Sequence, residues 1–409
     1  MNVLIITPYF PLPGNPVMGL WAMKQAQALQ RAGHDVTVVA PLSWVPRAAA
    51  RMPATVPRSS AMRSRATAPR VHRWDGLETV YPRWPVYHVG PQRGLLDRHP
   101  GAEARLGWLR LGRLLTSLVR ERRIDVVYAH GTGLAGYLAM RLKRATGAPF
   151  VSIDHELKEI TDCGRSPARL RHYAAVAREA SMMLSISSRM ERETNALLAP
   201  PRMRVLAPVA ADPVETGRSP VSERSRPPVI FSAGGFYRRK AFPALVQAFA
   251  RMAPRHPEVV LRIAGDGRDR KAVDAEVVRA GISDRVDLLG FVSHERILRE
   301  MARCDVFALV GWHEGKGAVF IEALAAGKPL VWASDGGIND FVQSGRHGLA
   351  VRPGSVEDTA EALDSLLSDP EGAMQMGEEG RSLHRARFTW EANAERLGAL
   401  FHEAAGTRG

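Results

Sequence analysis

Short apolar runs alternate with longer amphipathic stretches along the whole chain. The apolar runs are rich in Val, Ile and Leu, as in Asn2–Thr7 and Val306–Val310. Such runs predict strands that are buried on both faces of a parallel sheet. The stretches between them have the apolar spacing of helices, as in Ala104–Arg123. Strands that alternate with helices predict an α/β chain with doubly wound sheets.

The alternation of strands and helices occurs twice, and a segment of linker chemistry separates the two series. Residues 212–228 hold Pro, Ser and charged residues without apolar periodicity, which is typical of a linker. We therefore expect a first domain at 1–211, a second at 229–388 and a last helical segment at 389–409. The expected strands are Asn2–Thr7, Asp35–Ala40, Asp125–Ala129, Phe150–Ile153, Met182–Ile186 and a last one from Arg204 in the first domain, then Val229–Ser232, Val259–Ala264, Val286–Leu289, Val306–Val310, Leu330–Ala333 and Leu349–Val351.

The positive charge of the chain is concentrated in its first half. Residues 1–211 hold 30 Lys and Arg against 14 Asp and Glu, and the remainder holds 26 against 28, for a net charge of +14 over the chain. Such a field favours an anionic partner or surface, although an arginine-rich composition is an alternative explanation. Residues 41–74 contain seven Arg, five Pro and no acid. They are either a disordered solvated loop or a basic segment that orders on an acidic acceptor or membrane.

The composition points to a reduced compartment and gives no membrane-spanning segment. No apolar run approaches the ~18 residues that a spanning helix needs, and the N-terminus has the pattern of a strand and loop, not of a signal peptide. The two cysteines, Cys163 and Cys304, are widely separated and form no metal pattern. We expect a cytoplasmic protein. For Ala104–Arg123, packing on the sheet is the favoured interpretation and membrane binding is the second.

Glu322 is the most unusual residue, because it is the only charge in the apolar run from Ala318 to Gly327. It is either part of a solvated edge or internal ion pair, or a ligand contact. Glu314 lies eight positions earlier, and at ~1.5 Å per residue the carboxylates are on the order of 10 Å apart. That exceeds the ~5.5 Å of a retaining glycosidase pair. It is about the distance between a sugar and a ribose joined through two phosphates.

The amides between these two carboxylates form a natural anion site. Gly315, Lys316 and Gly317 lie where the helix is expected to begin, and free amides at a helix N-terminus attract phosphate. A second basic turn, Gly234–Lys240, follows the first strand of the second domain. Cations beside a departing diphosphate lower the barrier to its release without a metal. Alone, this turn is equally consistent with a solvated charge cluster.

Together, the run Glu314–Gly317, then Glu322, then Gly336-Gly337-Ile338 resembles the E-x7-E region of the retaining glycosyltransferases of family 4. The resemblance extends over almost the whole chain. It implies the GT-B fold: an α/β protein with two Rossmann-like domains that face a central cleft, and a C-terminal helix that crosses back to the first domain. It also implies transfer of a sugar from a nucleotide donor with retention of anomeric configuration.

The resemblance assigns donor-binding roles in the second domain. Lys240 matches the lysine of a K-G signature, with Ala241 in place of the glycine. The family often has an arginine where this chain has Gly235, so Arg239 or its neighbour Arg238 is expected to supply the second cation. By the same resemblance the nucleotide base is held by Phe291 and Val292. The ribose is assigned to Glu322, the transferred sugar to Glu314, and the diphosphate also to the amides of Gly315, Lys316 and Gly317.

In the first domain, the resemblance places Gly19 near the donor phosphates and His155 near the transferred sugar. Glu156 follows His155 where the family usually has glycine. The residues expected to take part in catalysis are therefore His155, Lys240 and Glu314. No G-x-G-x-x-G fingerprint is present at Gly265, which disfavours a nicotinamide enzyme.

The resulting hypothesis is a retaining, metal-independent glycosyltransferase. It would move a hexose from a UDP- or GDP-sugar to a hydroxyl of a lipid-linked or polysaccharide glycan, at the cytoplasmic face of the membrane. We expect no cofactor and no nucleic-acid partner; an anionic membrane surface is a second expected partner. The alternatives are a nucleotide-sugar epimerase of the same fold and a non-catalytic basic module that binds membrane or nucleic acid.

Overall fold

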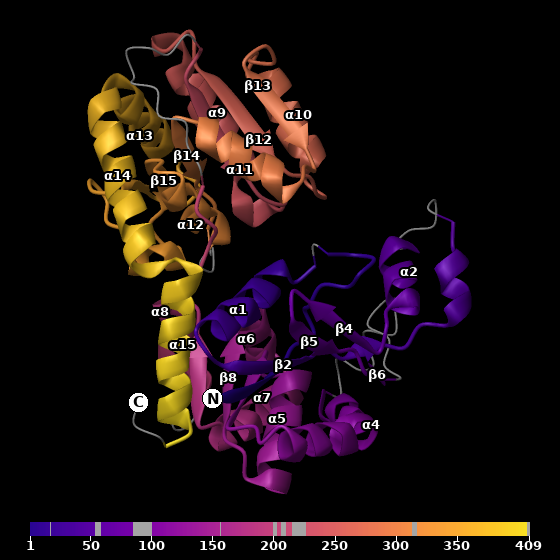
Figure 1. Cartoon of the computed structure of the whole chain (residues 1–409). Coiled ribbons are helices and arrows are strands. Elements are labelled where there is room, and N and C mark those ends of the chain that lie inside the picture. Colours follow the sequence, from indigo (N-terminus) through magenta and orange to yellow (C-terminus); the bar gives the residue numbers. More distant parts are fainter. Residues whose placement is uncertain are drawn as a thin grey trace. The chain divides into compact units, whose positions relative to one another are not determined.

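The computed structural model describes residues 1–16, 18–53, 59–84, 100–155, 157–198, 203–205, 210–214, 226–312 and 317–406. The chain divides into two compact units. Unit 1 is Met1–Pro208 together with Trp390–Gly409, and unit 2 is Val209–Thr389. Each unit is a sheet with helices on both faces (Figure 1). The expectation of two doubly wound α/β domains is therefore confirmed.

Unit 1 contains an eight-stranded sheet that is parallel except at one edge. Its order is β10 (Met203–Val205), β9 (Met182–Ser185), β8 (Phe150–Asp154), β7 (Val126–His130), β1 (Asn2–Ile6), β2 (Asp35–Val39), β5 (Leu77–Val80) and β4 (Val71–Trp74). Only β4 and β5 pair antiparallel within it. The helices are α1 (Leu20–Arg31), α2 (Ser59–Thr67), α4 (Pro100–Glu121), α5 (Leu134–Thr146), α6 (Leu157–Gly164), α7 (Pro167–Glu179), α8 (Ser188–Leu197) and α15 (Trp390–Ala404).

The two faces of this sheet carry separate apolar layers. Val3 and Ile5 of β1 pack with α1 and α15, whereas Leu4 and Ile6 pack with α4 and α5. Successive side chains of a strand point to opposite faces, so a continuous apolar run serves both layers. The four residues are fully buried.

Unit 2 contains a six-stranded parallel sheet. Its order is β13 (Val286–Gly290), β12 (Val260–Ala264), β11 (Val229–Ala233), β14 (Val306–Leu309), β15 (Leu330–Ala333) and β16 (Gly348–Val351). The helices are α9 (Phe242–Met252), α10 (Arg270–Arg279), α11 (His294–Arg303), α12 (Ala318–Ala325), α13 (Val356–Ser368) and α14 (Pro370–Arg387). Because the strand order reverses between β11 and β14, the ligand crevice of such a sheet is expected at the carboxyl ends of these two strands.

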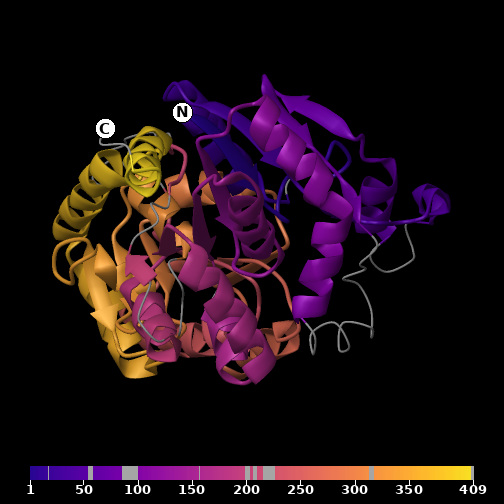
Figure 2. The ribbon, with the colours of Figure 1, turned by 90° about the horizontal axis from the view of Figure 1, so that it is seen from below.

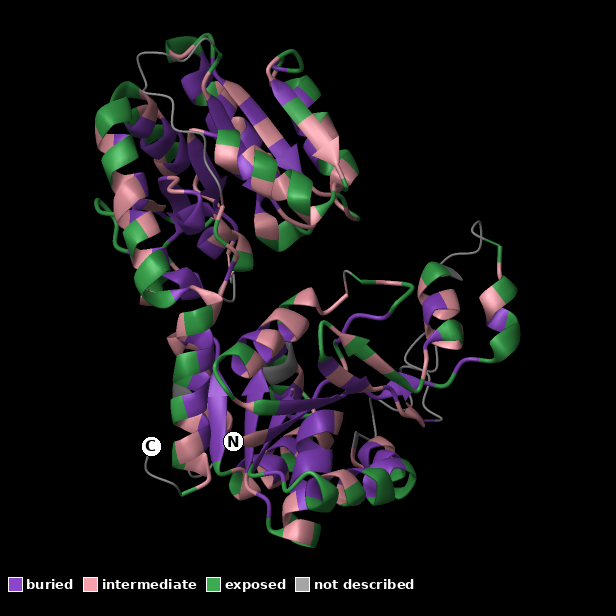
Figure 3. Cartoon of the chain, in the orientation of Figure 1, coloured by how far each residue is buried: buried purple, intermediate pink, exposed green. Residues whose placement is uncertain are grey.

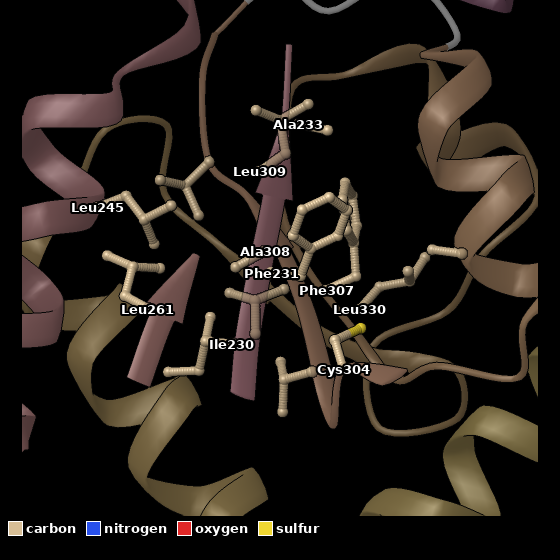
Figure 4. Packing of buried hydrophobic residues seen from close by; sticks show 14 of the residues in the cluster. Ile230, Phe231, Ala233, Leu245, Leu261, Cys304, Phe307, Ala308, Leu309 and Leu330 are labelled. Carbon is tan, nitrogen blue, oxygen red and sulfur yellow. The ribbon is translucent and has the colours of Figure 1, made fainter. Parts of the chain in front are cut away.

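The core of unit 2 is built from the sheet and the helices on both its faces. Phe231 of β11 and Phe307 of β14 lie beside Leu309 and Leu330, and Leu245 of α9 covers the opposite face (Figure 4). Cys304 is fully buried, and burial raises the pKa of its thiol to about 11.

The C-terminal helix α15 belongs to unit 1, where it packs against α1. Leu397 and Phe401 are fully buried, and the Phe401 ring lies 5.2 Å from that of Tyr128 in β7. The Gln25 amide donates a buried hydrogen bond of 3.1 Å to Asn393.

The basic segment at 41–74 is folded wherever the structure describes it. Residues 41–53 and 59–74 form β3 (Leu42–Ser43), a 3-10 turn at Arg47–Arg51, α2 and β4. The strand β3 pairs with β6 (Arg83–Trp84). Ser64 of α2 donates to the Gly14 carbonyl at 2.9 Å, which ties this helix to the loop after β1. The interpretation as a disordered loop is therefore wrong for these residues.

Removal of the Phe401 ring should loosen unit 1 selectively. The change Phe401→Ala deletes a fully buried ring, which costs roughly 3–5 kcal/mol. We expect faster hydrogen exchange in β7 and α1 and unchanged exchange in β11 and β14, measured by mass spectrometry. The exposed Glu395 on the same helix gives the control variant Glu395→Ala. Equal acceleration in both units would contradict the assignment of α15 to unit 1.

Candidate functional site

The carboxyl ends of β11, β12 and β14 in unit 2 are joined by direct backbone packing. A Cβ added to Gly265 would lie 1.9 Å from the Gly234 carbonyl oxygen, and one added to Gly267 would lie 2.6 Å from that of Phe236. A Cβ on Gly311 would lie 2.2 Å from the Arg239 oxygen. No side chain fits at these three positions. The Gly265–Gly267 pair therefore supports the basic turn and is not a dinucleotide fingerprint.

Lys240 lies at the end of the basic turn, in the 3-10 segment Arg238–Lys240. Its ammonium group folds back across the turn, because a Cβ built on Gly234 would lie 3.6 Å from Nζ. Arg239 is exposed beside it. Gly235 has room for its backbone only, since a Cβ there would lie 2.6 Å from the Tyr237 ring. The turn thus presents two neighbouring cations at the carboxyl end of β11.

The backbone conformation of Ala241 is one that favours glycine, which is the residue expected after the lysine of the K-G signature. Ala241 begins α9 with a φ of 52°, in the left-handed region. That region disfavours residues with a Cβ. The Ala241 methyl is 4% exposed, so its burial offsets part of this strain.

Glu322 has a partner that the sequence interpretation missed. Its Oε1 lies 2.9 Å from Nε2 of His294, and the Glu322 side chain is 14% exposed. His294 is the first residue of α11 and comes just after Phe291 and Val292. The contact is a carboxylate–imidazole hydrogen bond, which is the internal ion pair considered from the sequence when His294 is protonated. It joins α12 to the loop that was assigned to the nucleotide base, where Phe291 is 87% exposed.

The N-terminus of α12 lies close to this pair. Gly317 precedes the helix with a φ of 60° and, as a glycine, has no side chain of its own to cap it. The first amides of such a helix have no intrahelical partner. Glu314, Gly315 and Lys316 lie outside the described residues, so their assigned contacts with sugar and phosphate stay predictions.

Gly19 and His155 lie on two elements of unit 1 that meet at one end of its sheet. Gly19 precedes α1 with a φ of 73°, and a Cβ there would lie 2.5 Å from the Tyr9 carbonyl carbon. His155 follows β8. Trp21 in the first turn of α1 joins the two, since its ring centroid lies 4.3 Å from that of His155.

Two histidines and Trp21 form an aromatic cluster at these strand ends. The ring of His130, the last residue of β7, stacks on Trp21 at 5.0 Å and lies 5.3 Å from the His155 ring. His130 is 1% exposed. Neither of its ring nitrogens, nor Nε2 of His155, has a hydrogen-bond partner within the described residues. Burial lowers the pKa of His155 to about 4 and that of His130 well below its usual range, so both rings are neutral near pH 7.

Asp154 fixes the chain just before His155. Its fully buried carboxylate accepts hydrogen bonds from the Thr132 amide and hydroxyl, each at 2.9 Å, and from the Tyr173 hydroxyl. Burial raises the pKa of Asp154, and these bonds oppose that shift. The network ties the ends of β7 and β8 together and so orients His155.

The structure thus groups the predicted residues in three places. Gly235, Arg239 and Lys240 share the turn after β11, and Phe291, Val292, Gly317 and Glu322 lie around α11 and α12. Gly19 and His155 meet in unit 1. Sequence reasoning missed His294, Trp21 and His130, although each stands at a strand end or helix start where ligands bind α/β sheets. Among the described residues no cluster of His, Cys, Asp and Glu could hold a metal ion.

Two family models match the chain. Residues 18–209 match the glycosyl transferase 4-like domain, and residues 214–383 match the glycosyl transferases group 1.

The proteins that the chain is similar to include a glycogen synthase and a sugar transferase. Glycogen synthase of Mycobacterium tuberculosis is 27% identical over 96% of this chain and 92% of its own. The alpha-D-kanosaminyltransferase of Streptomyces kanamyceticus is 27% identical over 68% of this chain and 77% of its own.

Solved structures share the fold over the whole chain. Sucrose-phosphate synthase from Thermosynechococcus elongatus has a TM-score of 0.73 at 20% identity, and each chain is covered to 98%. Anabaena HepE in complex with UDP has a TM-score of 0.69 at 18% identity and covers 98% of this chain and 99% of its own. These matches confirm the GT-B fold.

The buried histidines should make unit 1 sensitive to acid. His155 binds a proton at pKa ~6.5 when unfolded but at about 4 when folded. The unfolded state therefore takes up more protons between these values, and stability is lost as the pH falls from ~6.5 towards 4. We expect His155→Gln to reduce this loss, measured by denaturant unfolding at several pH values. The matched change His72→Gln, on the edge strand β4, controls for the loss of an imidazole outside the buried cluster. A slope in His155→Gln equal to that of the unchanged protein would contradict this expectation.

Proposed function

Since the chain belongs to the family 4 glycosyltransferases, the group 1 type with the GT-B fold, we propose that it transfers a hexose from a UDP- or GDP-sugar with retention and without a metal. The proposed acceptor is a hydroxyl of a lipid-linked or polysaccharide glycan at the cytoplasmic membrane face. The observation that carries the donor assignment is the Glu322–His294 pair. It links α12 to the start of α11, just after the exposed Phe291, in the unit whose sheet carries a basic turn at its switch point.

We assign the ribose to Glu322 and the base to the loop at Phe291 and Val292. A carboxylate has about four acceptor sites, and the bond to His294 uses one of them. His294 also holds the carboxylate in one orientation, so less side-chain freedom is lost when a diol binds. Anabaena HepE, which shares the fold, has been solved with UDP and with UDP-glucose, and this supports a nucleotide-sugar donor.

We assign the diphosphate to the basic turn and to the amides before α12. Lys240 and Arg239 present cations at the carboxyl end of β11, and the amides of Gly315, Lys316 and Gly317 are expected to add donors at the helix mouth. Negative charge grows on the diphosphate as the glycosidic bond breaks. Fixed cations and amides that already face this charge stabilise the transition state without reorganising.

We assign the transferred sugar to Glu314 and His155. With a pKa of about 4, His155 is neutral near pH 7 and is not suited to act as a general acid. A neutral imidazole has one hydrogen-bond donor and one acceptor, which suits contact with sugar hydroxyls. In the proposed reaction the acceptor oxygen forms its bond on the face from which the diphosphate leaves. The acceptor proton passes to the departing phosphate oxygen. The glycosidic bond is broken and replaced, and no redox partner is needed.

Glu322→Ala tests the ribose assignment. Loss of hydrogen bonds to a charged group costs roughly 1.5–3 kcal/mol, so we expect UDP or GDP to bind at least about tenfold more weakly by titration calorimetry. His294→Gln should weaken binding less, because Glu322 remains. Glu357→Ala, on the exposed face of α13, is the control. Unchanged affinity in Glu322→Ala would leave the pair with a structural role only.

The proposed chemistry is tested with the unmodified protein. A thermal-shift panel of UDP-, GDP- and ADP-sugars identifies the donor, because a ligand of the folded state raises its stability. With that donor, we expect EDTA to leave the transfer rate unchanged and NMR to show a product with the anomeric configuration of the donor. Inactivation by EDTA or an inverted product would contradict the mechanism, and an epimer formed from the donor alone would favour an epimerase.

A further inference from the structure

The helix α4 has a second apolar face that does not take part in the core. Its inner face packs on the sheet and on α5 through residues that are nearly or fully buried, namely Ala104, Leu111, Leu115 and Val119. Figure 2 shows α4 as a long helix of unit 1, and the residues on its opposite side are exposed (green in Figure 3). We call that side the α4 outer face, and its residues are Arg105, Leu106, Leu109, Arg110, Arg113, Leu114 and Arg120.

The leucines of the α4 outer face are unusually exposed. Leu109 is 80% exposed, Leu106 is 40% exposed and Leu114 is 37% exposed. A single exposed leucine is ordinary in a folded protein. Leu106 and Leu109 are neighbours on the helix because they are three positions apart, and Leu114 lies about two turns after Leu106 on the same side; we call these three leucines the apolar strip.

Cations flank this strip and carboxylates do not. Four arginines belong to the α4 outer face, and no Asp or Glu occurs between residues 104 and 120. Glu103 and Glu121 stand at the two ends of the helix. Long arginine side chains can lay their methylene stems along apolar surface and keep the guanidinium in water or against phosphate.

We propose that the α4 outer face is a docking surface for an anionic lipid bilayer. A helix with leucines and arginines on one side lies in the plane of the interface, with its apolar side chains at the boundary between headgroups and acyl chains. The guanidinium groups then meet lipid phosphates, which are complementary in charge. Among the described residues no helix is long and apolar enough to cross a membrane.

The exposed leucines favour a bilayer over a nucleic acid. Arginines alone would fit either polyanion. Single-stranded nucleic acids, however, bind surfaces on which aromatic rings stack with the bases. The α4 outer face contains no aromatic residue. The one tryptophan of the helix, Trp108, lies on another side, where its ring is covered by the guanidinium of Arg141 of α5, 5.0 Å from the ring centroid. Aliphatic side chains gain most from leaving water for acyl chains.

The inference deepens the proposed function, since a lipid-linked acceptor would be met at that surface, but its test does not depend on catalysis. The full chain is mixed with vesicles of phosphatidylglycerol and phosphatidylcholine, and with vesicles of phosphatidylcholine alone, and sedimented at low and high salt. We expect binding to the anionic vesicles that weakens with salt, and none to phosphatidylcholine. Absence of binding at low salt would overturn the proposal.

Two variants divide the α4 outer face by chemistry. Leu106→Ser with Leu109→Ser removes the apolar strip, and Arg110→Gln with Arg113→Gln removes two cations. Since each arginine near an anionic surface is worth about fivefold in affinity, the second pair should bind on the order of 20-fold more weakly. The serine pair should also weaken binding. A control of similar exposure in unit 2 is Val278→Ser with Arg385→Gln and Arg387→Gln, which should bind as the unchanged protein does.

Two further measurements separate this proposal from the others. All variants should keep the melting temperature and the rate of donor hydrolysis in solution, because the α4 outer face holds none of the proposed donor contacts. If donor binding fails but vesicle binding follows the variants, the proposed function is wrong and the docking surface stands. Vesicle binding that survives both α4 variants would overturn the docking surface. So would binding that is insensitive to the serine pair and is displaced by single-stranded DNA.

Discussion

Close backbone packing at three strand ends is the constraint on which the donor side of unit 2 depends. The turn after β11 places Arg238, Arg239 and Lys240 in succession, and like charges so close repel one another. Glycines after β12 and β14 pack directly on the backbone of this turn, since a Cβ added to any of them would lie within 1.9–2.6 Å of it. Packing of backbone against backbone leaves the turn little freedom to open. The fold of the turn therefore keeps these three basic residues close together.

Two carboxylates, those of Asp154 and Glu322, differ in how many of their hydrogen-bond acceptor sites are already occupied by the protein. That difference separates a structural carboxylate from one that is available to a ligand. Asp154 is fully buried and accepts bonds from Thr132 and Tyr173, which occupy both of its oxygens. Glu322 is 14% exposed and within the described residues has one hydrogen bond, to a histidine that is itself 37% exposed. A carboxylate with spare acceptor sites and a path to solvent can bind a hydroxylated ligand; one that is saturated and buried cannot. The same reasoning distinguishes Glu322 from an ordinary buried ion pair, in which desolvation of both partners is complete.

The local sequence pattern predicted most of the fold, because the spacing of apolar residues within a single segment distinguishes a buried strand from an amphipathic helix. The expected strand Leu330–Ala333 agrees with the structure residue for residue. The pattern failed at 41–74, where arginine and proline mask elements that are stabilised by distant partners such as Gly14 and β5. His294, Trp21 and His130 were missed for the same reason. Their contacts depend on which strand ends and helix starts lie side by side in the folded sheet. A single stretch of sequence does not show which segments become neighbours.

The helix α4 shows the limit of periodicity from the other side. Its sequence contains leucines at nearly every turn. The helical spacing of apolar residues predicts one buried face, but it does not show whether some of the leucines lie on a second, exposed face. The structure separates Leu111 and Leu115, which are buried, from Leu106 and Leu109, which are not. The inner set fills the space between the sheet and α5, whereas the outer leucines are not part of this core cluster. Exposed leucines among arginines, with no Asp or Glu between residues 104 and 120, are complementary in both polarity and charge to an interface where an apolar phase is bordered by phosphate.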